Sequence, residues 1–357
     1  MKICLFAPGN SYHTKKWFDY FVKAGHEVQV VSFTKGMIEE RNLHFIDTGV
    51  DSGSAEKSKI KYLAYAGKVK RIIETIQPDR ISVHRASSYG AVAALAGLRN
   101  YTLSVWGEDI YAFPRKSIIH KVLLKFSLAR ATNLFSTSLA MAQEAQKYTK
   151  RHFEITPFGV DMELFSPQKR TRDVNDGEFI VGTVKALSPR YGIENLLKAA
   201  AIVKKDYPEI PLTVRIAGRG SHEEAYKQLA VELGIDDITH WLGFIPQNEA
   251  AKEWANMDVA VIPSQSESFG VSAVEAEACG IPVIITDIPG LKEATLPGET
   301  SVVVERNHPE QIAEKILWLF EHPYERYTTG QKGRKYVCEN YELNQCFSKI
   351  EELFQKQ

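Results

Sequence analysis

Short apolar, β-prone segments alternate along this chain with segments of helical periodicity, and this alternation constrains the fold more than any other feature. In the first part, strands are expected at residues 2–7, 28–33, 80–84 and 102–106, with helices at 13–24, 60–76 and 89–98. A helix that joins two successive strands is a crossover, and crossovers connect parallel strands. The pattern therefore predicts an α/β fold with a doubly wound parallel sheet.

A second series of the same kind follows a break. Residues 156–167 are rich in Pro and Gly and lead into a polar stretch, 168–178, without apolar periodicity. Further strands are expected at 179–183, 212–217, 239–242, 259–263 and 283–286, with helices between them and C-terminal helices at 309–320 and 324–354. We expect two Rossmann-like domains, 1–165 and 166–340, with the last helix, about 341–357, packed back on the first. Ligands of such sheets bind at the carboxyl ends of the strands.

The composition is that of an ordinary globular protein, with 44% hydrophobic and 25% charged residues among 357. It excludes a disordered chain, a collagen-like fibre and a small disulfide scaffold. The longest apolar stretch, 89–98, is too short for a bilayer span, and the N-terminus has no signal-peptide core. The four cysteines form no CxxC pair: Cys4, Cys279, Cys338 and Cys346. We therefore expect reduced thiols in a cytoplasmic protein.

The net charge of zero hides an asymmetry between the two halves. Residues 1–170 hold 25 Lys and Arg against 15 Asp and Glu, whereas residues 171–357 hold 19 against 29. The halves therefore carry +10 and −10. Opposite charges would help the halves to dock, or the first half meets an anionic partner.

Residues 264–276 carry the most informative chemistry. They follow an expected strand and open a helix, whose first N–H groups and positive dipole end favour an anion. Gly270 lets a ligand approach the backbone closely. Glu267 and Glu275 are eight positions apart, which is within about 80° around a helix, and carboxylates accept hydrogen bonds from sugar hydroxyls. A nucleotide-sugar diphosphate would fit here; two exposed helix glutamates are the alternative.

With Phe269 and Gly270 between them, the two glutamates resemble the E-x7-E motif of retaining GT-B glycosyltransferases of family 4 (glycosyltransferase group 1), of the bacterial surface-polysaccharide type. Further segments resemble that family's motifs in order and spacing: 157–167, 181–183, 217–220, 242–244, 278–283 and 289–290. The resemblance covers essentially the whole chain, with its specific part at 157–293. It implies two Rossmann-like domains facing a central cleft, with the acceptor on the first and the nucleotide-sugar on the second.

The resemblance also implies roles for the matching residues. Glu275 would hold the ribose hydroxyls, and Glu267 those of the transferred sugar. Other donor contacts are expected from Ser268, Phe269, Gly270, Val271, Gly218, Arg219, Gly220, Phe244 and Ile245. UDP is the common donor nucleotide of the family. The sequence has no Asp-x-Asp motif and no metal-spaced cluster. We therefore expect no metal and no cofactor beyond the donor.

One departure from the family concerns its two cations after the first strand of the second domain. The family usually has an Arg and a Lys five residues apart, where this chain has Ala186 and Tyr191. Lys185 and Arg190 stand one position earlier at the same spacing. Because a leaving diphosphate needs cationic partners, we expect these two to serve it. Two solvated loop charges are the alternative.

A second departure lies at the end of the strand expected at 102–106. Many family members carry a His there, and this chain has Trp106. Asp109 and Glu108 then become candidates to polarise the acceptor hydroxyl. The alternative for Asp109 is a helix N-cap.

The remaining acceptor-side candidates lie at strand–loop junctions of the first domain. His84 ends an expected strand, and His13 follows the loop that contains Gly9 and Asn10. A neutral imidazole can accept a proton or orient a sugar hydroxyl. A structural role is the alternative for each histidine.

A basic, partly apolar helix is expected at about 115–130. Its apolar residues share one face, which Lys121 and Lys125 flank: Ile118, Ile119, Val122, Leu123 and Phe126. A membrane-surface helix has this pattern, and so does a helix that packs on a sheet. The charge of the first half fits an anionic membrane or a lipid-linked sugar acceptor. No nucleic-acid-binding motif is present, so no nucleic-acid partner is expected.

The sequence therefore predicts a metal-independent hexosyltransferase that acts with retention in surface-glycan synthesis. It would move sugar from a nucleotide-sugar, with UDP expected, to a sugar or lipid-linked acceptor. We expect it in the cytoplasm, peripheral to the inner face of the plasma membrane. Two rivals remain: a UDP-sugar 2-epimerase of the same architecture, and a non-catalytic nucleotide-sugar-binding protein.

Overall fold

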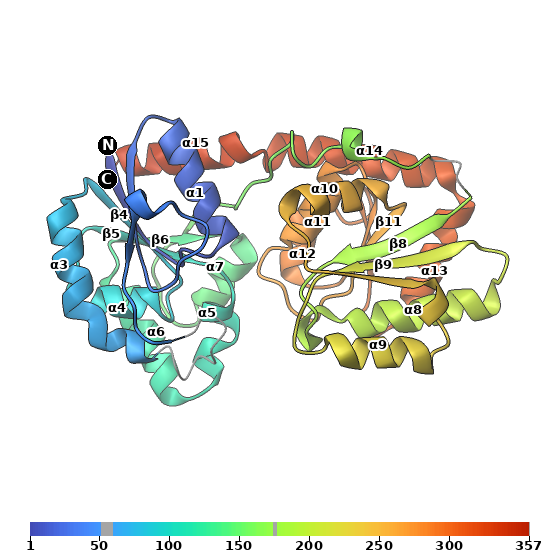
Figure 1. Cartoon of the computed structure of the whole chain (residues 1–357), viewed down its shortest axis with the longest axis horizontal. Helices are drawn as coiled ribbons and strands as arrows, with labels where there is room; N and C mark the ends of the chain where they lie inside the picture. The colour runs from blue at the N-terminus through green and yellow to red at the C-terminus, as the bar shows by residue number, and fades with distance from the viewer. Residues whose placement is uncertain (51–59, 174–176, 357) are drawn as a thin grey trace. The chain divides into compact units, whose positions relative to one another are not determined.

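The chain folds into two compact units, each built on its own parallel sheet (Figure 1). The computed structural model describes residues 1–50, 60–173 and 177–356. Unit 1 comprises Met1–Phe158 and Cys346–Gln357, and unit 2 comprises Gly159–Gln345.

Unit 1 contains a seven-stranded sheet in the order β3-β2-β1-β4-β5-β6-β7, with every described pairing parallel. Its strands are β1 (Lys2–Phe6), β2 (Glu27–Ser32), β3 (Leu43–Phe45), β4 (Arg80–His84), β5 (Tyr101–Val105), β6 (Asn133–Ser136) and β7 (Glu154–Ile155). Its helices are α1 (Tyr12–Lys23), α3 (Ala66–Ile76), α4 (Tyr89–Leu95), α5 (Glu108–Tyr111), α6 (Ile118–Arg130), α7 (Leu139–Ala145) and α15 (Leu343–Gln355), with 3-10 turns η1 (Glu40–Asn42), η2 (Ile60–Tyr65) and η3 (Phe113–Arg115).

Unit 2 contains a six-stranded parallel sheet in the order β10-β9-β8-β11-β12-β13. Its strands are β8 (Phe179–Val184), β9 (Leu212–Ala217), β10 (Thr239–Gly243), β11 (Val259–Ile262), β12 (Val283–Thr286) and β13 (Ser301–Val304). Its helices are α8 (Ile193–Asp206), α9 (Glu223–Glu232), α10 (Gln247–Asn256), α11 (Val271–Ala278), α12 (Pro289–Ala294), α13 (Pro309–Glu321) and α14 (Pro323–Asn340), with 3-10 turns η4 (Pro167–Lys169), η5 (Pro189–Tyr191) and η6 (Asp236–Ile238).

Helices cover both faces of each sheet, as the buried apolar clusters show. In unit 2 one cluster joins α8, α9 and α13 to one face, and a second joins α10, α11 and α14 to the other. The strands are apolar over nearly their whole length because both faces are buried. The predicted class, two doubly wound α/β sheets, is confirmed.

Four short strands were not predicted: β3, β6, β7 and β13. The single C-terminal helix predicted at 324–354 is wrong, because it is divided into α14 and α15. At the break, Val160 N–H donates to Tyr341 O at 2.7 Å, and Leu343 N–H donates to Val160 O at 2.9 Å. A parallel β-bridge with a distant segment takes the place of helical hydrogen bonds there.

α15 completes the core of unit 1. The ring of Phe347 lies 5.6 Å from that of Trp17, and Phe354 stacks on Phe21 at 5.6 Å. All four side chains are buried. In Figure 1 this red helix lies beside α1.

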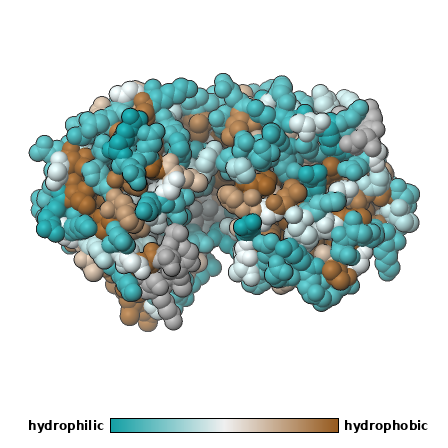
Figure 2. Space-filling model, viewed as in Figure 1, coloured by the Kyte–Doolittle hydropathy of each residue, from teal (hydrophilic) through white to brown (hydrophobic). Residues whose placement is uncertain are grey.

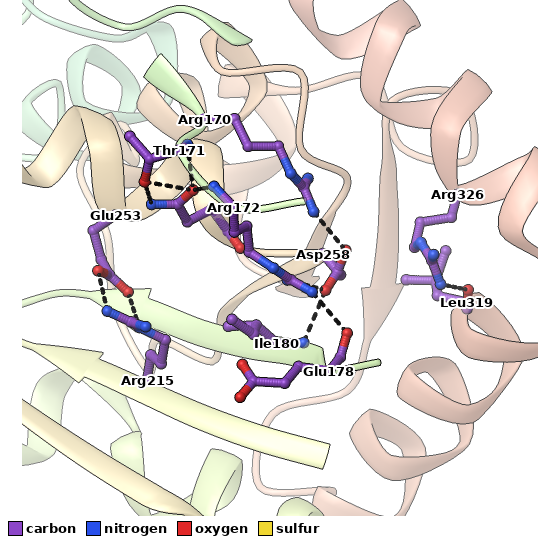
Figure 3. A network of polar contacts seen from close by, with 11 residues as sticks. Arg170, Thr171, Arg172, Glu178, Ile180, Arg215, Glu253, Asp258, Leu319 and Arg326 are labelled. Atoms are coloured by element: carbon purple, nitrogen blue, oxygen red, sulfur yellow. Dashed lines mark hydrogen bonds and ion pairs between the residues drawn. The ribbon is translucent and has the colours of Figure 1, made fainter. Parts of the chain in front are cut away.

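A buried carboxylate organises the amino-terminal edge of the unit 2 sheet (Figure 3). Asp258, directly before β11, accepts a hydrogen bond from Ile180 N–H at 2.9 Å and pairs with Arg172 at 2.7 Å and Arg170 at 3.3 Å. Parallel strands offer their ligand sites at the carboxyl edge. This network therefore holds 170–172 against the edge opposite to the candidate site.

Candidate functional site

A buried ion pair lies at the carboxyl edge of the unit 2 sheet. Lys185 directly follows β8, and its Nζ lies 2.5 Å from Oε1 of Glu267, in the loop after β11. The same Nζ lies 3.3 Å from the hydroxyl of Ser272 on α11. The side chains of Lys185 and Glu267 are 11% and 7% exposed. The structure thus brings together two residues that the sequence separates by 82 positions.

The charged state of Lys185 is set by opposing effects. Burial disfavours the ammonium form, but electrostatic interactions with Glu267, Tyr191 and Glu275 and the hydrogen bond to Glu267 outweigh it and raise the Lys185 pKa. Lys185 therefore carries a positive charge throughout the neutral pH range.

Arg190 reaches the same loop from η5. Its Nε donates to the backbone oxygen of Ser266 at 3.0 Å. The ring of Tyr191 lies beside both cations, 4.6 Å from Lys185 Nζ and 5.6 Å from Arg190 Cζ. The displaced pair of cations therefore borders the segment that the sequence singled out.

The start of α11 is shaped by Gly270. Its φ of +99° lies in the left-handed region, and an added Cβ would lie 2.6 Å from Leu291 Cδ2. Glu275 is buried on the same helix and acts electrostatically on Lys185. The Lys185 ammonium group thus contacts Glu267 and the first turn of α11, and the charge of Glu275 also acts on it.

The predicted glycine loop packs against the segment that carries Lys185. Leu187 N–H donates to Arg219 O at 3.0 Å. Gly218 has a φ of +144°, and a Cβ there or at Gly220 would overlap the backbone oxygens of Lys185 and Leu187. Further along this edge, Phe244 is 69% exposed, whereas Ile245 is half-buried.

In unit 1, His84 and Trp106 lie at the carboxyl ends of adjacent strands. Their rings are 4.8 Å apart, and Trp17 packs on His84 at 4.5 Å. His84 is fully buried, and its Nε2 lies 3.0 Å from Ser82 Oγ. Burial and then the nearby charge of Arg85 lower the His84 pKa to about 3, so the imidazole is neutral at physiological pH.

Asp109 holds two loops together rather than capping a helix. Its carboxylate accepts hydrogen bonds from the N–H groups of Ala86 at 2.8 Å, Gly107 at 2.8 Å and Trp106 at 3.1 Å. The N-cap of α5 is Gly107, so the N-cap alternative for Asp109 is wrong. Burial raises the Asp109 pKa, against the opposing effect of these hydrogen bonds.

The other acceptor-side candidates lie in the segments that follow β1 and β5. His13 stacks on Phe158 at 3.8 Å and lies 5.7 Å from the Trp106 ring. Gly9 N–H donates to Ser32 Oγ at 2.8 Å, and Asn10 accepts a hydrogen bond from Thr34 at 3.0 Å. Glu108 is exposed.

Sequence reasoning missed Arg85, the residue after β4. Its φ is +69°, which is uncommon for a residue other than glycine. Its guanidinium carbon lies 5.7 Å from the Trp106 ring. Residues with a strained backbone are often found at functional positions. No motif in the sequence indicates that an arginine adopts the left-handed conformation.

Replacing Asp109 by Asn is expected to lower the free energy of unfolding by about 1–3 kcal/mol. An amide has one acceptor oxygen, so it leaves a buried backbone N–H without its partner. Urea denaturation measures the effect. Glu108→Gln, at the exposed neighbouring position, is the control and should change stability by less than about 0.5 kcal/mol. Equal effects of the two substitutions would contradict the anchoring role.

Two further features are absent from the described part of the chain. Within residues 1–50, 60–173 and 177–356, no three His, Cys, Asp or Glu side chains gather as they would around a metal ion. In the same part of the chain, no helix has the length and apolar character needed to cross a bilayer.

Comparison with protein families decides the assignment. Residues 166–336 match the model of "Glycosyl transferases group 1", and residues 2–138 match that of "Glycosyl transferase 4-like". The chain belongs to the group 1 glycosyltransferases. The resemblance to the group 1 glycosyltransferases seen in the sequence is thereby confirmed.

Curated relatives and solved structures agree with this assignment. A D-inositol 3-phosphate glycosyltransferase of Arthrobacter is 33% identical over 57% of this chain and 50% of its own length. An uncharacterized glycosyltransferase of Methanocaldococcus jannaschii is 27% identical over 83% and 81%. The chain spans about half the length of several of the curated relatives that it matches.

Sucrose-phosphate synthase from Thermosynechococcus elongatus shares the fold with a TM-score of 0.86 at 19% identity, over 100% and 98% of the two chains. Anabaena HepE, solved with UDP, has a TM-score of 0.81 at 17% identity over all of both chains.

Proposed function

We propose that this group 1 glycosyltransferase moves a hexosyl group, with retention, from a UDP-sugar to a sugar acceptor. The observation that carries the proposal is the buried Lys185–Glu267 pair at the tip of α11. An ammonium and a helix N-terminus suit a diphosphate, and carboxylates suit sugar hydroxyls. The HepE structures with UDP and with UDP-glucose support this choice of donor.

In the proposed reaction, the bond between the sugar C1 and the diphosphate oxygen breaks, and C1 bonds to an acceptor hydroxyl oxygen. Lys185, Arg190 and the α11 dipole stabilise the charge that develops on the leaving diphosphate. The hydroxyl proton passes to a leaving phosphate oxygen. The proposal needs no metal ion, so EDTA is expected to leave the activity unchanged.

The proposed sites divide between the units. Glu275 holds the ribose, Glu267 the transferred sugar, and the helix tip and glycine loop the rest of the donor. On the acceptor side we propose contacts from Gly9, Asn10, His13, Trp106 and Glu108. His84 and Asp109 are buried, and we propose that they position the strand-end loops around these contacts.

We further propose a lipid-linked acceptor in surface-glycan synthesis and a cytoplasmic, membrane-peripheral location. The exposure of Ile118 and Ile119, 81% and 78%, supports this. These two residues lie outside the core, whereas Leu123, Leu124 and Leu128 of the same helix pack in the core of unit 1, as the sheet-packing alternative expects. The α6 side chains that are buried are Leu124, Ser127 and Leu128.

Titration of UDP, GDP and ADP into the protein, followed by calorimetry, tests the donor site. We expect UDP to bind best, and Glu275→Ala to weaken it about 10–100-fold, because hydrogen bonds to a charged group are lost. Glu314→Ala is the control, since that glutamate is 65% exposed on α13. Unchanged UDP affinity in Glu275→Ala would remove Glu275 from the donor site.

Product analysis then tests the reaction. Transfer of sugar to an added acceptor with release of UDP is expected. Isomerised UDP-sugar without an acceptor would favour the epimerase, and binding without turnover would favour the non-catalytic protein.

A further inference from the structure

An open apolar groove lies on the surface of unit 1. It holds about 550 Å³, within the range of about 300–1,000 Å³ found for small-molecule sites. Its walls come from η2, α4 and α6, and include Ile60, Leu63, Leu95, Ile118 and Val122. Figure 2 shows hydrophobic side chains at the lower end of this unit.

The exposed apolar groups of the groove are large and contiguous. Val122 is 59% exposed, Ile60 53% and Leu95 50%, in addition to the two isoleucines that begin α6. Contiguous exposed apolar surface of this kind marks a binding site more often than isolated hydrophobic residues do.

One end of the groove lies next to the acceptor-side residues. Ser87 and Ser88 line it, three and four positions after His84 at the end of β4. Arg85 precedes these serines, and its charge acts on Tyr62, whose η2 neighbours Ile60 and Leu63 form a groove wall. Within the described residues no carboxylate lies within 4.0 Å of the Arg85 guanidinium as an ion pair, although its charge also acts on the buried Asp109. Two serines thus line the apolar groove, and a cation, Arg85, precedes them by two residues.

The segment that contains α6, one wall of the groove, is rich in basic residues, although Arg115 within it pairs with Glu144 at 3.0 Å. The sequence has no Asp or Glu between Asp109 and Glu144, whereas that interval contains five Lys or Arg: Arg115, Lys116, Lys121, Lys125 and Arg130. Lys121 and Lys125 are exposed on α6, the helix that forms one wall. Exposed cations on this wall attract an anionic head and repel a cationic one.

We propose that this groove holds the hydrocarbon chain of an anionic single-chain lipid, with its phosphate head at Arg85, Ser87 and Ser88. The inference rests on the proposed lipid-linked acceptor and specifies how the lipid part is bound. The apolar walls suit a hydrocarbon chain rather than a sugar polymer, and Arg85, two residues before the lining serines, accounts for the anionic head. A chain seated here would bring its head group to the strand ends of the acceptor side.

Decyl phosphate below its micelle concentration is the probe, with inorganic phosphate and decyl maltoside for comparison. We expect saturable binding of decyl phosphate at one site, and at least about tenfold weaker binding in Val122→Glu, because a charge then enters the apolar groove. Val231→Glu is the matched control, a valine that is 56% exposed on α9 of unit 2. Absence of saturable binding, or equal losses in the two variants, would overturn the proposal.

The Arg85→Asn variant tests the position of the head group independently of the binding of the hydrocarbon chain. Asparagine tolerates the left-handed backbone, so the loop keeps its conformation without the charge. We expect about tenfold weaker binding of decyl phosphate and unchanged binding of decyl maltoside. Equal effects on both amphiphiles would contradict the assigned head-group position.

Vesicles of phosphatidylglycerol and phosphatidylcholine distinguish a seated chain from a membrane-docking face. Vesicle binding that Val122→Glu abolishes, without any binding of monomeric decyl phosphate, would overturn the single-chain site. UDP titration of the same samples keeps the two proposals apart. If the unsubstituted protein binds UDP but no amphiphile, only the proposed lipid groove is contradicted. If the unsubstituted protein does not bind UDP, the proposed function is contradicted.

Discussion

Lys185→Met is expected to lower kcat by about 10²–10³-fold, the range found when one group that stabilises developing charge is removed. Its ammonium is held in place before the reaction by Glu267 and Ser272, at 2.5 and 3.3 Å. It therefore needs little reorganisation when a leaving diphosphate develops charge. Initial rates with UDP-glucose measure the effect, and Lys185→Arg should recover part of the rate.

The same substitution is expected to destabilise unit 2. Glu267 is buried, and without Lys185 its charge loses its partner. Breaking a buried ion pair in this way costs about 3–5 kcal/mol. Denaturation of Lys185→Met, Glu267→Gln and the double variant separates folding from catalysis. The double variant should regain stability but not activity, since the cation is still missing.

A surface ion pair provides the control. Lys252 and Glu249 on α10 lie 2.9 Å apart and are 47% and 46% exposed. Lys252→Met should change stability by less than about 1 kcal/mol and leave kcat unchanged. Recovery of full activity in the Lys185→Met/Glu267→Gln double variant would contradict a role for Lys185 in the reaction.

Glu277→Met is expected to stabilise the protein. Glu277 is fully buried on α11. Among the described residues, no donor lies at hydrogen-bonding distance and angle from its carboxyl oxygens. Burial raises the Glu277 pKa to about 8, and the nearby Thr300 hydroxyl offsets only part of this effect. At pH 7 this raised pKa lowers the free energy of unfolding by about 3 kcal/mol, compared with a carboxyl group of ordinary pKa. Met has a similar volume and no polar group to bury.

The sign of the pH dependence follows from the raised pKa. In the folded state Glu277 keeps its proton up to about pH 8, whereas in the unfolded chain it loses it near the ordinary value of 4.5. Stability is therefore greatest below about pH 4.5 as far as this group is concerned, and falls as pH rises to about 8.

Thermal unfolding between pH 5 and 8 tests this expectation. The gain in Tm from Glu277→Met should grow across that range, whereas Glu314→Met, at an exposed helix position, should give no such trend. Gly333 of α14 packs against Glu277, because a Cβ added to Gly333 would lie 3.0 Å from Cγ of Glu277. Methionine at position 277 has the same Cγ atom at this contact, so no clash with Gly333 is expected. A pH-independent gain would show that packing, and not ionisation, causes the stabilisation.

The sequence predicted most of the fold because its main signals are local. Alternating apolar and helical segments, with Gly and Pro between them, are enough to define β/α units. The missed strands β3 and β7 have three and two residues, which is too short for a period to be visible. The break between α14 and α15 depends on a hydrogen bond to Val160, far away in the sequence.

The residues of the candidate site likewise fall into those that the sequence could predict and those that it could not. Glu267, Glu275 and the displaced cations could be recognised because spacing and a known motif mark them, although their roles stay predictions. The left-handed Arg85, the backbone anchoring by Asp109 and the buried Glu277 could not be recognised. Each depends on which loops and helices the fold brings together, and a charged residue in a sequence is ordinarily expected at the surface.

The return of α15 to unit 1 has a consequence for the order of synthesis. The first 158 residues leave the ribosome early, but the segment that covers Trp17 and Phe21 starts at Cys346, after all of unit 2. At about 5–20 residues per second, the intervening 187 residues take on the order of ten to forty seconds. During that time the nascent unit 1 exposes a large aromatic surface. It is therefore the first part of the chain to be made and the last to be complete, and the nascent chain is a natural client for chaperones.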